Sequence, residues 1–146
     1  MKTLIELIEK IYPGVHVAIE DQEEFEFKFN HPEYSLDVYV GKSEFSYTSV
    51  NDERVFYTLS INIPGAWKII DQDQLEVAYR VCNEFNENTS ILKSSIYDER
   101  RITVGCNTIL TPETAELCLT DTVEFCIAGW IELNSLMDKS LFVERE

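Results

Sequence analysis

The stretch VFYTLSINI, from Val55 to Ile63, decides the fold of this chain. Its odd-numbered residues are apolar or aromatic, and the residues between them, Phe56 apart, are polar. Alternation with a period of two is typical of a β-strand that has one face against a core and the other face in water. Such half-buried strands belong to antiparallel sheets, so this stretch predicts one, with Leu59 and Ile61 on its inner face.

The residues before this stretch repeat the same alternation. It recurs in the segments 15–19, 25–29, 36–40 and 45–48. Residues that favour turns separate the later segments: His31-Pro32, Gly41-Lys42-Ser43 and Asn51-Asp52. We therefore predict three or four consecutive strands joined by short turns. The longest of these strands ends at Pro64-Gly65.

Helical spacing replaces the alternation on both sides of these strands. Apolar residues at 4–11 follow a capping box of Thr3 with Glu6, and Pro13-Gly14 ends this first helix. A second capping box, Asp73 with Glu76, begins the next helix. Asn86 and Asn88 are expected to stop it.

A hairpin and a last helix complete the chain. Segments 91–97 and 101–110 alternate like strands on either side of a turn at 98–100. Thr111 then caps the last helix, with Pro112 at its first position and Glu113 near the positive end of its dipole. The apolar spacing carries this helix to about Met137.

The predicted element order is α-β-β-β(β)-α-β-β-α. Consecutive strands with helices between the blocks indicate the α+β class, here an antiparallel sheet with helices on one face. The expected inner face consists of Phe25, Phe27, Phe29, Leu36, Val38, Val40, Tyr57, Leu59, Ile61, Ile96, Ile102 and Val104. We expect residues 1–140 to form a single domain and residues 141–146 to be a C-terminal tail.

Composition excludes several classes of protein. The 146 residues are 45% hydrophobic, which excludes intrinsic disorder, and their 12 basic and 27 acidic residues give a net charge of −15. This acidity disfavours direct binding to nucleic acid and adsorption to anionic membranes. No apolar stretch is long enough to span a membrane, and Glu6, Glu9 and Lys10 interrupt what a signal peptide would need as its apolar core. We expect a cytoplasmic protein.

The four cysteines fit that compartment. None of them forms a C-x-x-C motif, so neither a thioredoxin site nor a zinc knuckle is indicated. Cys118 and Cys126 would lie about 12 Å apart along a helix, beyond the roughly 7 Å that a disulfide spans. Cys82 and Cys126 fall on apolar helical stripes, where we expect them to be small buried hydrophobes.

Motifs that carry chemistry are missing from the sequence. His16 and His31 accompany no nucleophile or metal-binding motif and are expected at surface or edge positions. The acidic run at 20–24 lacks the glycine and ligand spacing of a calcium loop, which favours a solvated turn. We predict no catalytic residue, no metal and no cofactor, hence a protein that is not an enzyme.

Three motifs in the second half carry a family resemblance. AYRVCNEFN, from Ala78 to Asn86, is a predicted helix that ends in N-x-x-N. ILKSSIYDERRITV, at 91–104, is a hairpin with an acidic turn, and LTPE at 110–113 opens the last helix. In these features the chain resembles the YbjN family, which has a type III secretion chaperone-like fold; the N-terminal half agrees in element order. The resemblance implies a chaperone-like or protein-binding domain, often dimeric, with no established reaction.

The outer face of the predicted sheet supplies the candidate binding residues. Tyr39, Phe56 and Tyr97 lie there among serines, threonines, asparagines and glutamates. Exposed aromatics with polar neighbours are typical of interaction surfaces. They also occur as cross-strand pairs that merely stabilise a sheet, and both interpretations stay open.

The resulting hypothesis is a non-catalytic, chaperone-like protein-binding domain that forms a homodimer and uses this sheet face. Its partner is another protein, with no nucleic acid and no membrane involved. The alternative is an acidic immunity or antitoxin-type protein that neutralises a basic toxin 1:1. The first hypothesis predicts a homodimer that holds extended client segments. The second predicts a complex whose association rate falls steeply with salt.

Overall fold

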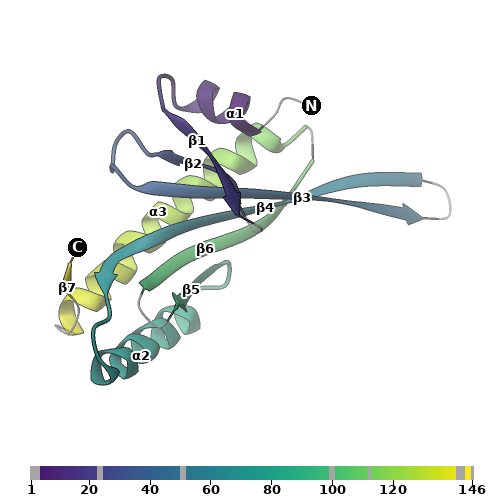
Figure 1. Ribbon diagram of the computed structural model, residues 1–146. Helices are drawn as coiled ribbons and strands as arrows, with labels where there is room; N and C mark the ends of the chain where they lie inside the picture. The colour runs from purple at the N-terminus through teal and green to yellow at the C-terminus, as the bar shows by residue number, and fades with distance from the viewer. Residues whose placement is uncertain are drawn as a thin grey trace. The chain divides into compact units, whose positions relative to one another are not determined.

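The computed structural model describes residues 4–22, 25–49, 52–98, 101–111, 113–140 and 144–145. Within them lie three helices and seven strands (Figure 1). The helices are α1 (Leu4–Ile11), α2 (Gln72–Asn88) and α3 (Ala115–Ser140). The strands are β1 (Val17–Gln22), β2 (Phe25–Asn30), β3 (Asp37–Ser49), β4 (Asp52–Lys68), β5 (Leu92–Tyr97), β6 (Arg101–Leu110) and β7 (Glu144–Arg145).

The strands form an antiparallel sheet in the order β1-β2-β3-β4-β6-β5, and the two-residue β7 pairs with β4. The α+β class with an antiparallel sheet is confirmed. The predicted segments 36–40 and 45–48 belong to a single strand, β3. Because β1 and β5 stand at the ends of this order, they are the edge strands of the main path.

Two compact units make up the chain. Unit 1 comprises residues 1–61 and 107–123, and unit 2 comprises residues 62–106 and 124–146. β4, β6 and α3 each contribute residues to both units.

The core of unit 1 follows the predicted alternation. Phe27 and Phe29 of β2 are buried opposite Val40 and Val38 of β3, their partners in the register. The ring of Tyr12, just after α1, stacks on Phe29 with the ring centroids 5.5 Å apart. Burial of these large side chains is the main stabilising term of such a layer, at roughly 1.5–3 kcal/mol for each.

In unit 2 the helices α2 and α3 pack on the inner side of β5. Gly129 of α3 lies against Leu92 of β5 and Phe85 of α2, and a Cβ atom at this position would clash with the Leu92 Cδ1 atom. The Ser94 hydroxyl, on the same side of β5 as Leu92, donates to the Cys82 carbonyl of α2 at 3.2 Å. Both helices therefore cover one face of the β5–β6 hairpin.

The predicted inner face is largely buried. Its fully buried members are Phe27, Phe29, Val38, Val40, Leu59, Ile61, Ile102 and Val104. Leu36 and Ile96 are half-buried instead, because Leu36 precedes β3 and Ile96 is close to the end of β5. The side chains of Phe25 and Tyr57 lie outside the described residues.

Two predicted turns are wrong. β3 continues through Gly41-Lys42-Ser43, so Gly41 is a buried strand residue rather than a turn. β4 likewise continues through Pro64-Gly65 to Lys68. A Cβ atom at residue 65 would stand 2.7 Å from the Ile102 carbonyl oxygen, so this glycine lets the β6 backbone approach closely. In both places strand pairing overrides the local preference for a turn.

The helices begin at other residues than predicted. Asp71, not Asp73, caps α2, and its carboxylate accepts the Gln74 N–H at 2.8 Å. α3 begins at Ala115, beyond the predicted start at Pro112, because the Thr114 N–H returns to the Thr111 carbonyl at 3.1 Å and forms a turn first. The predicted end of α2 at Asn88 is confirmed.

Within the predicted tail, β7 pairs with β4 through Trp67↔Arg145 and Lys68↔Glu144, whereas residues 141–143 and 146 lie outside the described residues. Among the described helices, none combines the length and the apolar character that crossing a membrane requires.

Candidate functional site

The open side of the β5–β6 hairpin is the candidate binding surface. Burial alternates along both strands: Leu92 and Ser94 are buried in β5, and Ile102, Val104 and Cys106 are buried in β6. The residues between them therefore point to the opposite side, which is exposed or half-exposed. We call this surface the hairpin face; it consists of Lys93, Ser95, Tyr97, Arg101, Thr103 and Gly105, all of unit 2.

The strand register places the residues of the hairpin face in cross-strand pairs. Tyr97 lies opposite Arg101, Ser95 opposite Thr103 and Lys93 opposite Gly105. The Ser95 and Thr103 hydroxyls are hydrogen-bonded to each other at 2.9 Å. The centre of the face is thus small and hydroxyl-rich, with a tyrosine and two cations around it.

Tyr97 is the exposed aromatic of this surface. Its side chain is 65% exposed, which is a large apolar area to leave in water. The predicted exposure of Tyr97 on the outer sheet face is thereby confirmed, whereas its role in binding stays a prediction.

Tyr39 has a different environment. It lies on β3 in unit 1, is half-buried, and pairs with Lys28 of β2 in the register. The Lys28 Nζ atom stands 5.7 Å from the centre of the Tyr39 ring, within the range of a cation–π contact. This contact supports the interpretation of Tyr39 as a stabilising cross-strand pair.

Phe56 is the third predicted binding residue. Phe56 belongs to β4, but its side chain lies outside the described residues. Tyr39 belongs to unit 1 and Tyr97 to unit 2, and each surface is described within its own unit.

Asn86 of α2 closes the outer edge of β5, a role that we did not predict. The Ser94 N–H donates to the Asn86 Oδ1 atom at 2.7 Å, and the Asn86 Nδ2 group donates to the Ser94 carbonyl at 3.0 Å. The Ser94 hydroxyl also lies 3.2 Å from the Oδ1 atom. The side-chain amide therefore takes the place that a neighbouring strand's backbone would occupy.

Other features protect the outer edge of β5 and the edge of β1. The Leu92 carbonyl accepts the Thr89 hydroxyl at 3.0 Å, which engages a second outward group of β5. At the other edge, the register between β1 and β2 shifts between Ile19 and Gln22. Such an irregularity bends a strand and hinders the addition of another one.

Two cysteines from distant segments meet in the core of unit 2. Cys106 of β6 and Cys126 of α3 are buried and hydrogen-bonded to each other, and neither forms a disulfide. The hydrogen bond from Cys126 lowers the pKa of Cys106 to about 7, against the opposing effect of burial. The same contact, together with burial, raises the pKa of Cys126. Because both thiols are buried, their contact belongs to the packing of α3 on β6.

The two histidines differ in exposure. His16 is exposed, as predicted, but His31 is only 2% exposed, so its predicted surface position is wrong. The His31 ring lies edge-on to the Tyr12 ring at 4.8 Å between centroids, and its Nδ1 atom accepts the Glu33 N–H at 3.2 Å. The ring is buried because the β2–β3 turn folds it onto the segment that follows α1.

The described residues contain no cluster of three or more His, Cys, Asp or Glu side chains that could hold a metal ion. The predicted turn at 20–24 is wrong for residues 20–22, because β1 continues through Gln22 with a register shift after Ile19; the side chains of this acidic run lie outside the described residues.

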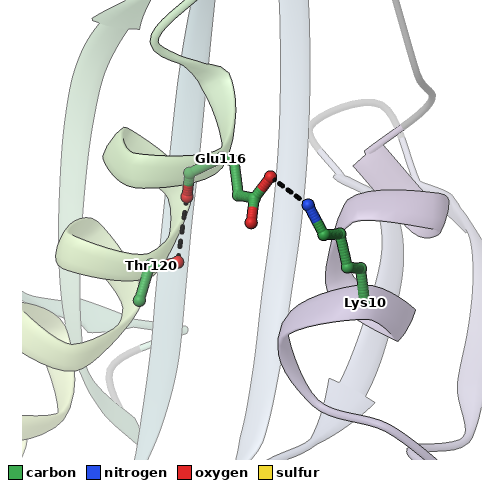
Figure 2. A network of polar contacts seen from close by, with 3 residues as sticks. All are labelled: Lys10, Glu116 and Thr120. Atoms are coloured by element: carbon green, nitrogen blue, oxygen red, sulfur yellow. Dashed lines mark hydrogen bonds and ion pairs between the residues drawn. The ribbon is translucent and has the colours of Figure 1, made fainter.

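Figure 2 shows a polar network in unit 1 that is structural in character. The Lys10 Nζ atom of α1 forms an ion pair with the Glu116 carboxylate of α3 at 2.7 Å, and the Thr120 hydroxyl donates to the Glu116 carbonyl at 2.9 Å. Both charged side chains are about half exposed, so the pair contributes roughly 0–1 kcal/mol.

Glu113 belongs to the turn before α3. Its own backbone N–H and the Thr111 hydroxyl donate to its carboxylate, and these hydrogen bonds lower its pKa. The charge therefore stays at the positive end of the helix dipole, as the sequence suggested, although the helix itself begins two residues later.

Comparisons with protein-family models, with curated proteins and with solved structures yield no match for this chain.

Proposed function

We propose that this chain is a non-catalytic protein-binding domain of the chaperone-like type, related to the YbjN family, and that the hairpin face is its contact surface. The observation that carries the proposal is Tyr97, a side chain 65% exposed on a sheet face whose opposite side is buried under two helices. Rigid aromatic side chains of this kind dominate the energy of protein interfaces.

The protected edges support binding through a face rather than through an added strand. Asn86 occupies the hydrogen-bonding groups of β5 at Ser94, and the register of β1 is irregular. An extended client added to either edge would have to displace these features. A partner that lies across the hairpin face leaves them intact.

Photo-crosslinking tests the proposed surface. A photoreactive phenylalanine analogue replaces Tyr97 in the full chain, expressed in its native cells. The matched control carries the same analogue at Tyr79, which is 49% exposed on α2. We expect a discrete adduct with one protein at position 97 and none at position 79. Identical adducts at both positions, or none at position 97, would show that the hairpin face is not the contact surface.

We also propose that the domain is a homodimer, through the exposed side of α3 in unit 2. Phe125 and Ile131 are 48% and 47% exposed there, with the exposed Ala128 between them. Light scattering should give twice the chain mass of 17.0 kDa at low and at high salt. Phe125→Asp should yield monomers, whereas Ile70→Asp, at a residue 54% exposed before α2, should not. A wild-type monomer would refute the dimer and leave the hairpin-face proposal standing.

The acidic side of α2 favours a second candidate, an immunity or antitoxin-type protein. Asp73, Glu76, Glu84 and Glu87 are exposed on this helix, beside a single cation, Arg80. Such a surface suits a basic partner in a 1:1 complex. Charge neutralisation on α2, for example Glu84→Gln with Glu87→Gln, would then slow association, and the Tyr97 substitution would not.

A further inference from the structure

The hairpin face is cationic on a strongly acidic protein. The net charge of the chain is −15, yet the described strand residues of this face include Lys93 and Arg101 and no carboxylate. Asp98, the next residue along, belongs to the turn after β5. Over a Debye length of about 8 Å at physiological salt, such local charges decide what binds, because more distant charges are screened.

The acidic residues of α2 point away from the hairpin face. The buried side of α2 packs against the inner side of β5, where Ser94 contacts Cys82. Asp73, Glu76, Glu84 and Glu87 occupy the opposite side of the helix, within a stripe at helical spacing. The cations and these carboxylates therefore face opposite directions within unit 2.

A second copy of the chain does not fit the hairpin face. Two hairpin faces stacked on each other would bring Lys93 and Arg101 against their own counterparts, and like charges facing each other cost affinity. Placing the face on the acidic side of α2 of another copy would be a head-to-tail contact, because the two surfaces point in opposite directions. Such a contact repeats without closing into a dimer. The occupant is therefore a different molecule.

We propose that the hairpin face binds an acidic segment of another protein, with carboxylates at Lys93 and Arg101 and an apolar side chain against Tyr97. This inference rests on the proposed function and names the chemistry of its partner. Lys93 is four residues from Tyr97, roughly 13 Å along the strand, and Arg101 lies opposite Tyr97. An extended segment with two carboxylates four residues apart matches this separation.

The Ser95–Thr103 pair leaves room for the bound segment to lie directly on the hairpin face, between Lys93 and Arg101. Small side chains between the two cations leave the backbone of the hairpin close to the surface, and their hydroxyls can hydrogen-bond to a bound peptide. Nucleic acid is a poorer occupant, because two cations neutralise few phosphates and a long polyanion would extend beyond the hairpin face along a chain whose net charge is −15.

A peptide titration followed by NMR tests the inference on the full chain. The probe is a serine nonapeptide with glutamate at positions 3 and 7 and leucine at position 5; the control peptides carry glutamine or lysine at the same positions. We expect the acidic probe to shift the amide signals of β5 and β6, with an affinity about tenfold above that of the glutamine peptide, because two exposed ion pairs contribute up to about 1 kcal/mol each.

Matched variants locate the charges. Lys93→Gln with Arg101→Gln should weaken binding of the acidic probe about tenfold. If the amide shifts come from unspecific binding, this double variant should bind the probe as tightly as the unchanged chain. Arg101 makes contacts within the fold, so Lys93→Gln alone is measured as well, with an expected two- to fivefold loss. Arg80→Gln removes one cation from α2 and should leave the affinity unchanged.

The possible results separate this inference from the proposed function. Equal affinity for the acidic and glutamine peptides, an equal effect of Arg80→Gln, or complete displacement by 10 mM inorganic phosphate would overturn the acidic segment as the occupant. If crosslinking at position 97 still captures one protein in that case, the contact surface stands and its charge preference is wrong. If both experiments fail, the hairpin face is not a binding surface.

Discussion

Replacement of Asn86 by alanine should destabilise the protein well beyond what an ordinary surface substitution does. The change removes the three contacts of the side-chain amide with Ser94, at 2.7, 3.0 and 3.2 Å. Two of these contacts are independent hydrogen bonds, because the single proton of the Ser94 hydroxyl is shared with the Cys82 carbonyl. At about 1 kcal/mol net for each hydrogen bond, roughly 2 kcal/mol is lost. Alanine is the better helix former by about half a kcal/mol, so we expect a loss of about 1–2 kcal/mol in the free energy of unfolding.

Denaturant unfolding followed by far-UV circular dichroism measures this loss. Asn83→Ala is the matched control, because Asn83 is exposed on the same helix and gains the same helix propensity. That control should be neutral or slightly stabilising. Hydrogen exchange adds a local measurement: the Ser94 amide, which donates to Asn86, should exchange faster in the alanine variant by more than global destabilisation explains.

A second consequence concerns association. Without Asn86, the Ser94 N–H and carbonyl are unpaired at an edge strand, and such edges recruit other strands. Asn86→Ala should therefore show a mass that rises with concentration, whereas Asn83→Ala should not. If Asn86→Ala unfolds within 0.5 kcal/mol of the control and its Ser94 amide stays protected, the side chain does not close the edge and the reasoning is wrong.

Three further predictions concern the interior of unit 2. Gly129→Ala should lower the free energy of unfolding by about 1–3 kcal/mol, measured by denaturant, because its Cβ atom would clash with a buried leucine methyl group on β5, despite better helix propensity. Gly65→Ala should cost at least as much in the same assay, since its Cβ atom would stand 2.7 Å from a backbone carbonyl of β6 that cannot move independently; unchanged stability would mean that the two strands lie further apart. Thiolate absorbance at 240 nm should show Cys106 losing its proton at about pH 7, and Cys126→Ala should raise that midpoint. Because folding lowers the pKa of Cys106, its contribution to stability is present above the unfolded-state pKa and is lost as the pH falls through 7; an unchanged midpoint in the variant would contradict the thiol contact.

Side-chain periodicity made the sheet and its inner face predictable. The alternation at 55–63 is a property of neighbouring residues, and it placed Leu59 and Ile61 on the buried side as the structure has them. The same local pattern exposed Tyr97. Local signals also gave the end of α2 at Asn88 and the hairpin turn after Tyr97, because caps and turns depend on residues close in the chain.

Contacts between distant residues decided the rest. Gly41 and Gly65 continue strands because neighbouring strands pair with them, and the sequence shows only that each is a glycine. The burial of His31 and the meeting of Cys106 with Cys126 require segments that the chain brings together by folding.

Some features of the candidate site likewise follow from the sequence, and others follow only from the tertiary structure. The sequence by itself determined an acidic α+β protein with an aromatic residue on an open sheet face. Only the tertiary structure paired Arg101 with Tyr97, placed Lys93 at the other end of β5, turned the carboxylates of α2 away from this face and assigned Asn86 to the edge of β5. Strand register and helix docking set these positions, and both depend on packing between residues that are far apart in the chain.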